Sequence, residues 1–190
     1  MLNRKKTAIL HATSHIQDRC KQAKKTRMAT LLEDIKQQSD WTVKAFKSDG
    51  IELDYSIGSL LEIDRFIQKY TKNGRPIKGG RLSKNLGGIV FSISAYIGET
   101  LIKNVPNSKW ITDDNDPQGE INIAVELGDG TTCWPGQRII KRIQNGLEDG
   151  IYPYGHNLTE KTLNEKFDKS FWEIEKEVKP MEPKKPWWKF

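Results

Sequence analysis

Basic residues recur along one expected helix, and their type and spacing suit the binding of an anionic partner. Arg138, Lys141, Arg142 and Asn145 follow Pro135 at positions i, i+3, i+4 and i+7. Residues at this spacing share one helix face, and isoleucines are expected on the opposite face. Such a basic stripe can contact phosphate groups or acidic side chains. The alternative is an ordinary solvated helix face, which is the commoner role of a run of charges.

A second set of basic residues lies in a glycine-rich loop just ahead of another expected helix. Its members are Lys72, Arg75, Lys78, Arg81 and Lys84. Helix N-termini attract anions, and Gly74 and Gly79 have the spacing of a phosphate-binding P-loop. Gly80 and Arg81, however, stand where that motif requires Lys and Ser or Thr. We expect a surface loop, with Arg75, Lys78 and Arg81 as candidate contacts to an anion or a partner.

The other reactive side chains do not combine into a metal or catalytic motif. His11 and His15 have helical i, i+4 spacing, but no glutamate completes an H-E-x-x-H pattern. Residues 114–119 begin like an EF-hand loop, yet its twelfth position is Val125 instead of a bidentate glutamate. No G-x-S-x-G sequence is present. We predict no metal, no cofactor and no catalytic residue.

Two residues have both a structural and a functional interpretation. Cys133 forms a nucleophilic pair with His156 only if the fold brings the two together, and we expect a buried structural thiol instead. Glu99 follows an apolar segment, so its carboxylate needs a partner such as Arg138 or Lys141. Carboxylates of this kind are structural in most proteins, and a catalytic role is the alternative.

Residues 179–190 combine prolines, lysines and aromatic residues, which favours an extended tail over a helix. Trp187 and Trp188 are the candidate contact residues of this tail. They can rest at a membrane interface or stack on nucleic-acid bases. They can also fold back into an apolar groove of their own domain. The last interpretation is favoured, because exposed adjacent tryptophans promote aggregation.

The element that must position these residues is the uncharged stretch Asn85–Gly98, NLGGIVFSISAYIG. Its large apolar residues recur at helical spacing, and glycine, serine and alanine occupy the remaining positions. A helix that is apolar or small on every side is covered by neighbours on every side. The stretch is shorter than the about 20 apolar residues that span a bilayer. We predict the central buried helix of a soluble domain.

A β portion follows this helix. Trp110 begins a first strand, and residues 121–127 alternate apolar and polar side chains as a second strand does. Gly128-Asp129-Gly130 predicts a hairpin turn, and residues 131–134 the return strand. Pro135 suits the first turn of the next helix, whose isoleucines 139, 140 and 143 are expected to face inward.

The remaining helices frame this centre. Residues 1–38 predict one or two basic helices, and Asp40 can cap a short helix carrying Trp41 and Phe46, although the same residues also permit a strand. A further helix is expected from Ser56 to Thr71. Residues 151–156 predict an aromatic loop, and Asn157 can cap a last helix that extends to Val178.

Strands that follow helices without βαβ alternation predict an α+β fold. We expect several helices around a central buried helix, packed on a small antiparallel sheet of about three strands. Three regions are expected: a basic helical region over residues 1–38, a single α+β domain over residues 39–178, and the tail over residues 179–190.

Composition limits the class of protein and of partner. The chain has 190 residues and a formal net charge of +6, so it suits one domain with anionic partners: nucleic acid, membrane headgroups or an acidic protein surface. It has two cysteines without CxxC spacing, which favours a reducing compartment. The N-terminal apolar run is too short for a signal peptide. We expect a cytoplasmic protein with no transmembrane segment.

Three short motifs resemble a small bacterial α+β domain family of unknown function. They are LDYS before a helix, AYIGE within an apolar helix, and WPGQRIIKRIQNG after a strand, and together they cover about Leu53–Gly150. Members of this family carry a YxGE-type helix, a strand that begins with Trp, and a P-x-x-x-[IV]-x-K-R helix. The resemblance implies an α+β fold. Small bacterial proteins of this kind often serve as immunity proteins that bind and block a toxin.

These observations favour a non-enzymatic protein-binding module, with an immunity-like inhibitor of a toxin as its most concrete form. The alternative is a nucleic-acid-associated protein that uses the basic N-terminal region, the loop over residues 72–84 and the tail. An enzyme is the third interpretation, and no combination of residues in the sequence supports it.

Overall fold

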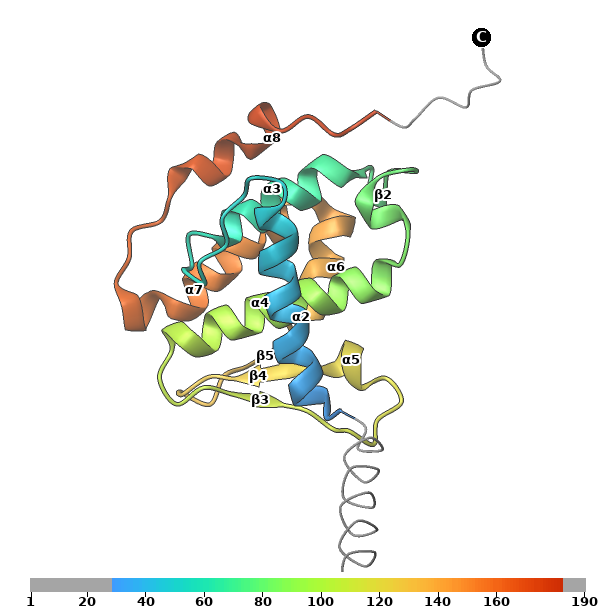
Figure 1. Ribbon diagram of the computed structural model, residues 1–190. Helices are drawn as coiled ribbons and strands as arrows, with labels where there is room; N and C mark the ends of the chain where they lie inside the picture. Colours follow the sequence, from blue (N-terminus) through green and yellow to red (C-terminus); the bar gives the residue numbers. More distant parts are fainter. Residues whose placement is uncertain (1–28, 183–190) are drawn as a thin grey trace, which may run out of the picture. The chain divides into compact units, whose positions relative to one another are not determined.

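The structure, a computed structural model, describes residues 29–182 of the chain (Figure 1). Its helices are α2 (Leu31–Lys47), α3 (Leu60–Tyr70), α4 (Leu86–Asn104), α5 (Gly119–Asn122), α6 (Pro135–Asn145), α7 (Ile151–Leu163) and α8 (Ile174–Glu177). Three short 3-10 turns are η1 (Arg81–Ser83), η2 (Gly146–Asp149) and η3 (Lys169–Glu173). The predictions that lie outside the described residues concern the helices before residue 29, His11, His15, Trp187 and Trp188.

Helix α4 is the central helix that the sequence predicts. All of its side chains from Phe91 to Gly98 are buried, because α2 crosses it and α6 and α7 pack against it (Figure 1). The one large polar side chain among them is Tyr96. Its hydroxyl lies 2.6 Å from the Ser59 hydroxyl and accepts a hydrogen bond from the N–H of Tyr55 at 3.0 Å. The polar atom is therefore satisfied inside the apolar core.

Helix α4 is also the one helix within residues 29–182 that is long and apolar enough to cross a membrane. A share of 56% of its 18-residue window is buried inside the protein. The core helix of a globular protein satisfies the same criteria of length and composition, so these criteria are weak evidence for a membrane span.

Helix α2 differs from its prediction. It runs without a break from Leu31 to Lys47, so Asp40 lies inside the helix and caps nothing, and the strand alternative for residues 41–46 is wrong. Ile35, Ser39, Thr42 and Phe46 recur at helical spacing on its buried face. A single amphipathic face therefore continues through the predicted boundary between residues 38 and 39, and the compact unit begins at Leu31.

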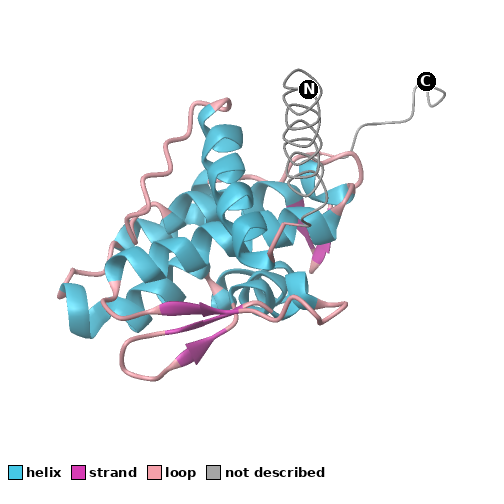
Figure 2. Ribbon diagram, turned by 60° about the horizontal axis from the view of Figure 1, so that its bottom comes forward, coloured by secondary structure: helices cyan, strands magenta, loops and turns pink. Residues whose placement is uncertain are grey.

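Three short strands form the antiparallel sheet that the sequence predicts, which completes an α+β fold. They are β3 (Lys109–Ile111), β4 (Ala124–Glu126) and β5 (Thr132–Cys133), in the order β3-β4-β5. Val125 pairs with Trp110 on one side and with Cys133 on the other. Figure 2 shows these strands along one side of the helices.

The predicted second strand is shorter than expected. Residues 119–122 form the short helix α5, because the Asp116 carboxylate accepts hydrogen bonds from the Gln118 N–H and the Asn122 side chain. The alternating pattern of residues 121–127 therefore contributes only three residues to the sheet. Ile121, expected in that strand, becomes an exposed residue of α5.

The predicted glycine-rich loop contains a small hairpin. Strands β1 (Thr71–Lys72) and β2 (Arg75–Pro76) pair antiparallel across Asn73 and Gly74. Both turn residues have positive φ, 53° and 72°, which Asn and Gly adopt most readily. A Cβ on Gly74 would lie 2.8 Å from the backbone oxygen of Gln144, so the hairpin packs closely on the end of α6.

The C-terminal helices also differ from their prediction. The residues expected to form an aromatic loop form the first turns of α7, which ends at Leu163 and is followed by Asn164 in the left-handed conformation (φ 49°). The predicted helix from Asn157 to Val178 is instead divided among α7, η3 and α8. Helix α7 begins early because a side chain distant in sequence, Asp64, caps its first N–H groups.

Candidate binding groove

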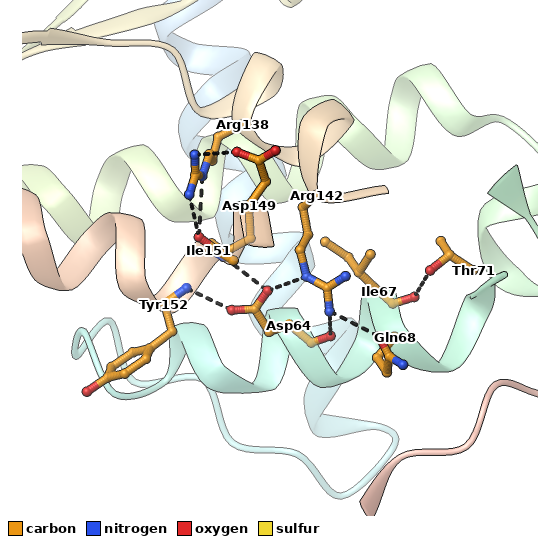
Figure 3. Close-up of polar contacts among 10 residues, drawn as sticks. Asp64, Ile67, Gln68, Thr71, Arg138, Arg142, Asp149, Ile151 and Tyr152 are labelled. Carbon is orange, nitrogen blue, oxygen red and sulfur yellow. Dashed lines mark hydrogen bonds and ion pairs between the residues drawn. The ribbon is translucent and has the colours of Figure 1, made fainter. Parts of the chain in front are cut away.

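Arg142, a predicted partner contact, is buried in the interior of the domain. Its side chain is 1% exposed, and its Nε donates to the Asp64 carboxylate at 2.7 Å (Figure 3). Its Nη2 donates to the backbone oxygen of Asp64 at 3.1 Å and to Gln68 at 3.4 Å. The prediction that Arg142 belongs to a surface stripe is therefore wrong.

Asp64 joins three helices through this pair. Its carboxylate also accepts from the N–H groups of Ile151 and Tyr152, at 3.0 and 2.8 Å, where α7 begins. Burial raises the pKa of Asp64, while the charge of Arg142 and the two N–H groups act in the opposite direction. Because its contacts join residues of three helices, the pair positions α3, α6 and α7.

Arg138 is also occupied within the domain. Its guanidinium pairs with Asp149 at 2.8 Å and donates to the backbone oxygen of Gly150 (Figure 3). It also lies over the ring of Tyr154, 4.9 Å from the ring centroid. Of the three basic residues predicted to form the stripe on α6, only Lys141 is exposed. The structure therefore shows no basic stripe on this helix.

The basic residues of the loop are at the surface, as the sequence predicts. Arg75 and Lys78 are exposed, and they stand on and just after strand β2. Arg81 pairs with Asp49, with its Nη2 2.6 Å from the carboxylate. Their assignment as partner contacts stays a prediction.

Cys133 and His156 have separate partners. Cys133 is buried, its thiol donates to the backbone oxygen of Val125 at 3.5 Å, and burial raises its pKa. His156 Nε2 lies 3.0 Å from the backbone oxygen of Glu165, and its ring packs against Tyr152. The contacts of Cys133 and of His156 are those of structural residues, as expected for a buried thiol.

Glu99 accepts a hydrogen bond from the indole N–H of Trp110 at 2.8 Å, whereas the sequence suggested Arg138 or Lys141 as its partner. Within residues 29–182, no group of three or more His, Cys, Asp and Glu side chains is placed to hold a metal ion.

An apolar groove between α4, α5 and α6 is the surface feature best suited to binding. Its volume is about 600 Å³. Three separate segments line it, with Leu86, Gly87, Gly88, Val90 and Phe91 from α4, Glu120 and Ile121 from α5, and Gly136, Gln137, Ile140, Lys141 and Gln144 from α6. Ile121 is 64% exposed and Ile140 is 36% exposed. Exposed apolar side chains gathered in a concave surface mark an interaction site.

Two glycines determine the shape of the groove. A Cβ on Gly87 would meet no atom within 4 Å, so this position leaves space above the helix. A Cβ on Gly136 would lie 3.3 Å from the Ser94 hydroxyl, so this glycine lets α6 approach α4 closely. The groove is therefore a consequence of small residues on both facing helices.

The edge of the groove is polar and carries charges of both signs. Lys141, Gln137 and Gln144 come from α6, and Glu120 comes from α5, and all four are exposed. An apolar floor with a polar edge is the usual composition of a protein-protein interface. Lys141 is the one predicted partner contact that lines this groove.

The groove is not predicted from the sequence, although the sequence contains two signals of it. The pair Gly87-Gly88 leaves one end of an apolar helix without side chains. Ile140 is expected to face inward, yet it lies at the edge of the buried face of α6 and remains partly exposed. Neither signal identifies the third wall, because Ile121 is expected in a strand.

No protein-family model matches the chain, and no curated protein and no solved structure shows significant similarity to it.

Proposed function

We propose that the protein is a non-enzymatic protein-binding module that holds an apolar segment of a partner in the groove between α4, α5 and α6. The observation that carries this proposal is the exposure of Ile121 and Ile140 in one concave surface. An amphipathic helix is a suitable ligand, since such helices place apolar side chains in grooves of this kind. An acidic residue beside the apolar segment can pair with Lys141.

The same groove suits the immunity-like form of this function. Five of its residues, Gly136, Gln137, Ile140, Lys141 and Gln144, belong to the motif WPGQRIIKRIQNG. A toxin with an exposed apolar segment is the partner expected for an immunity-like protein. Helix α6 gives the nucleic-acid alternative no support, because Arg138 and Arg142 pair with Asp149 and Asp64 and are not free to contact phosphates.

Replacement of one groove residue tests the proposal. Wild-type protein captures the partner from nuclease-treated host lysate, and the identified partner is then purified for affinity measurements. Ile140→Asp places a charge on the apolar floor, so we expect binding at least about tenfold weaker, a loss of about 1.4 kcal/mol. Ile111→Asp is the matched control, because Ile111 is 42% exposed on β3 and does not line the groove.

Two results would contradict the proposal. Equal affinity of the folded Ile140→Asp protein and wild type would exclude the groove as the binding site. Recovery of partners only in the absence of nuclease would favour the nucleic-acid alternative, whose affinity also falls steeply with salt.

A further inference from the structure

A second apolar hollow lies between α2, α3 and α4, apart from the proposed partner groove. Its volume is about 300 Å³. Phe46, Phe66 and Ile93, all buried, line it together with the partly buried Ile89. Trp41 also lines it, yet this side chain is 54% exposed. The hollow therefore leaves a large aromatic surface without cover among the described residues.

The last described residues are held beside this hollow. The N–H of Met181 donates to the backbone oxygen of Lys69 at 2.8 Å. The Met181 sulfur lies against Gly80, where an added Cβ would be 3.0 Å from it. The next residue, Arg81, is one of those that line the hollow. The chain is therefore fixed near one edge of the hollow at Met181, just before residues 183–190.

The tail has the length and the chemistry to fill the hollow. Trp187 is six residues beyond Met181, and an extended chain of that length covers up to about 20 Å. Pro183 and Pro186 favour such an extended backbone. The side chains that follow are large and apolar, and Arg81 at the edge can lie over an indole ring, as arginine does in cation–π contacts.

We propose that residues 183–190 fold back over this hollow and insert one indole of the Trp187–Trp188 pair beside Trp41. The contact covers apolar surface both on the tail and on the domain, which is its driving force. It uses a different surface from the groove between α4, α5 and α6, so it does not depend on the proposed protein-binding function.

The full-length chain with labelled isoleucine methyl groups tests this contact by NMR. Removing both indoles in Trp187→Ala/Trp188→Ala is expected to shift the methyl signals of Ile89 and Ile93, because ring currents act over short distances. Trp172→Ala is the matched control, since Trp172 is exposed on η3 and does not line the hollow. Unchanged Ile89 and Ile93 signals in the double variant would overturn the proposal. A shift of Ile121 and Ile140 instead would place the tail in the partner groove and would also overturn it.

A synthetic peptide of residues 183–190 gives a second, independent measurement. We expect it to bind the full-length Trp187→Ala/Trp188→Ala protein, whose hollow is vacant, and to bind wild type at least about tenfold more weakly, because the wild-type tail competes for the site. Filling the hollow with Ala45→Leu is expected to abolish this binding, whereas Gly87→Leu in the partner groove leaves it unchanged. Equal binding to the double variant and its Ala45→Leu derivative would reject the hollow as the site of the tail.

Discussion

At the scale of single residues, the buried pair of Asp64 and Arg142 shows how a basic residue can be misread from sequence. In a helix with 3.6 residues per turn, Arg142 lies about 60° from Ile139 and about 40° from Arg138 around the axis. The same position therefore fits both a basic stripe and the buried face. Asp64, with its hydrogen bonds to Arg142 and to the start of α7, places Arg142 on the buried face.

Because of this pair, we expect substitution of Arg142 to lower stability strongly and substitution of the adjacent Lys141 to change it little. Arg142→Met leaves the Asp64 carboxylate buried without its cation, so we expect the free energy of unfolding to fall by about 3–5 kcal/mol. Lys141→Met changes an exposed residue, and we expect a change within about 0.5 kcal/mol. Urea denaturation measures both. Equal stabilities of the two variants would show that the pair contributes little to the fold.

At the scale of elements, close approach of α4 to the sheet depends on one glycine. The ring of Trp110 on β3 lies against Gly98, where an added Cβ would overlap the ring. The adjacent Glu99 holds the same indole through its N–H. These two residues of the AYIGE segment therefore fix the position of strand β3 on the central helix.

We expect substitution of Gly98 to destabilise the protein, whereas the same substitution at Gly87, on the same helix, does not. Gly98→Ala forces Trp110 to move, and we expect a loss of about 1–3 kcal/mol. Gly87→Ala adds a methyl group in open space within a helix, where alanine is favoured over glycine by about 0.5–1 kcal/mol. Thermal and urea unfolding compare the two variants. A Gly98→Ala protein as stable as Gly87→Ala would contradict the close packing of Trp110.

At the scale of the whole molecule, several groups that ionise at alkaline pH are buried or half-buried. Burial raises the pKa values of Tyr96, Tyr154 and Cys133 above their ordinary values of 10.0, 10.0 and 9.0. The folded state therefore holds these protons more tightly than the unfolded state. The resulting stability is fully present below the unfolded pKa values and is lost as the pH rises toward the folded ones.

We therefore expect the free energy of unfolding to fall between about pH 8 and about pH 11, by at most about 1.4 kcal/mol per pH unit for each proton involved. Tyr96→Phe removes one of these groups, so its stability should depend less steeply on pH than that of wild type, although it loses the hydrogen bond to the Tyr55 N–H. Denaturant titrations across this range measure the slope. A slope that is unchanged in Tyr96→Phe would exclude Tyr96 as a contributor.

Local patterns in the sequence were sufficient for part of this fold. The uncharged stretch around Ile93 predicts α4, the Gly128–Gly130 turn predicts the β4–β5 hairpin, and Pro135 marks the start of α6. Each of these signals lies within a few residues of the structure that it determines, because helix periodicity and turn conformation are local properties of the backbone.

The sequence by itself thus determined the fold class, the central helix and the hairpin of the sheet. Only the tertiary structure decided that Arg142 is internal, that α7 begins at Ile151, and that Ile121 and Ile140 share a groove. Asp64 is separated from Arg142 by 78 residues and from Ile151 by 87. The environment of a charged or apolar side chain depends on which distant segments pack beside it, and neither periodicity nor composition specifies those contacts.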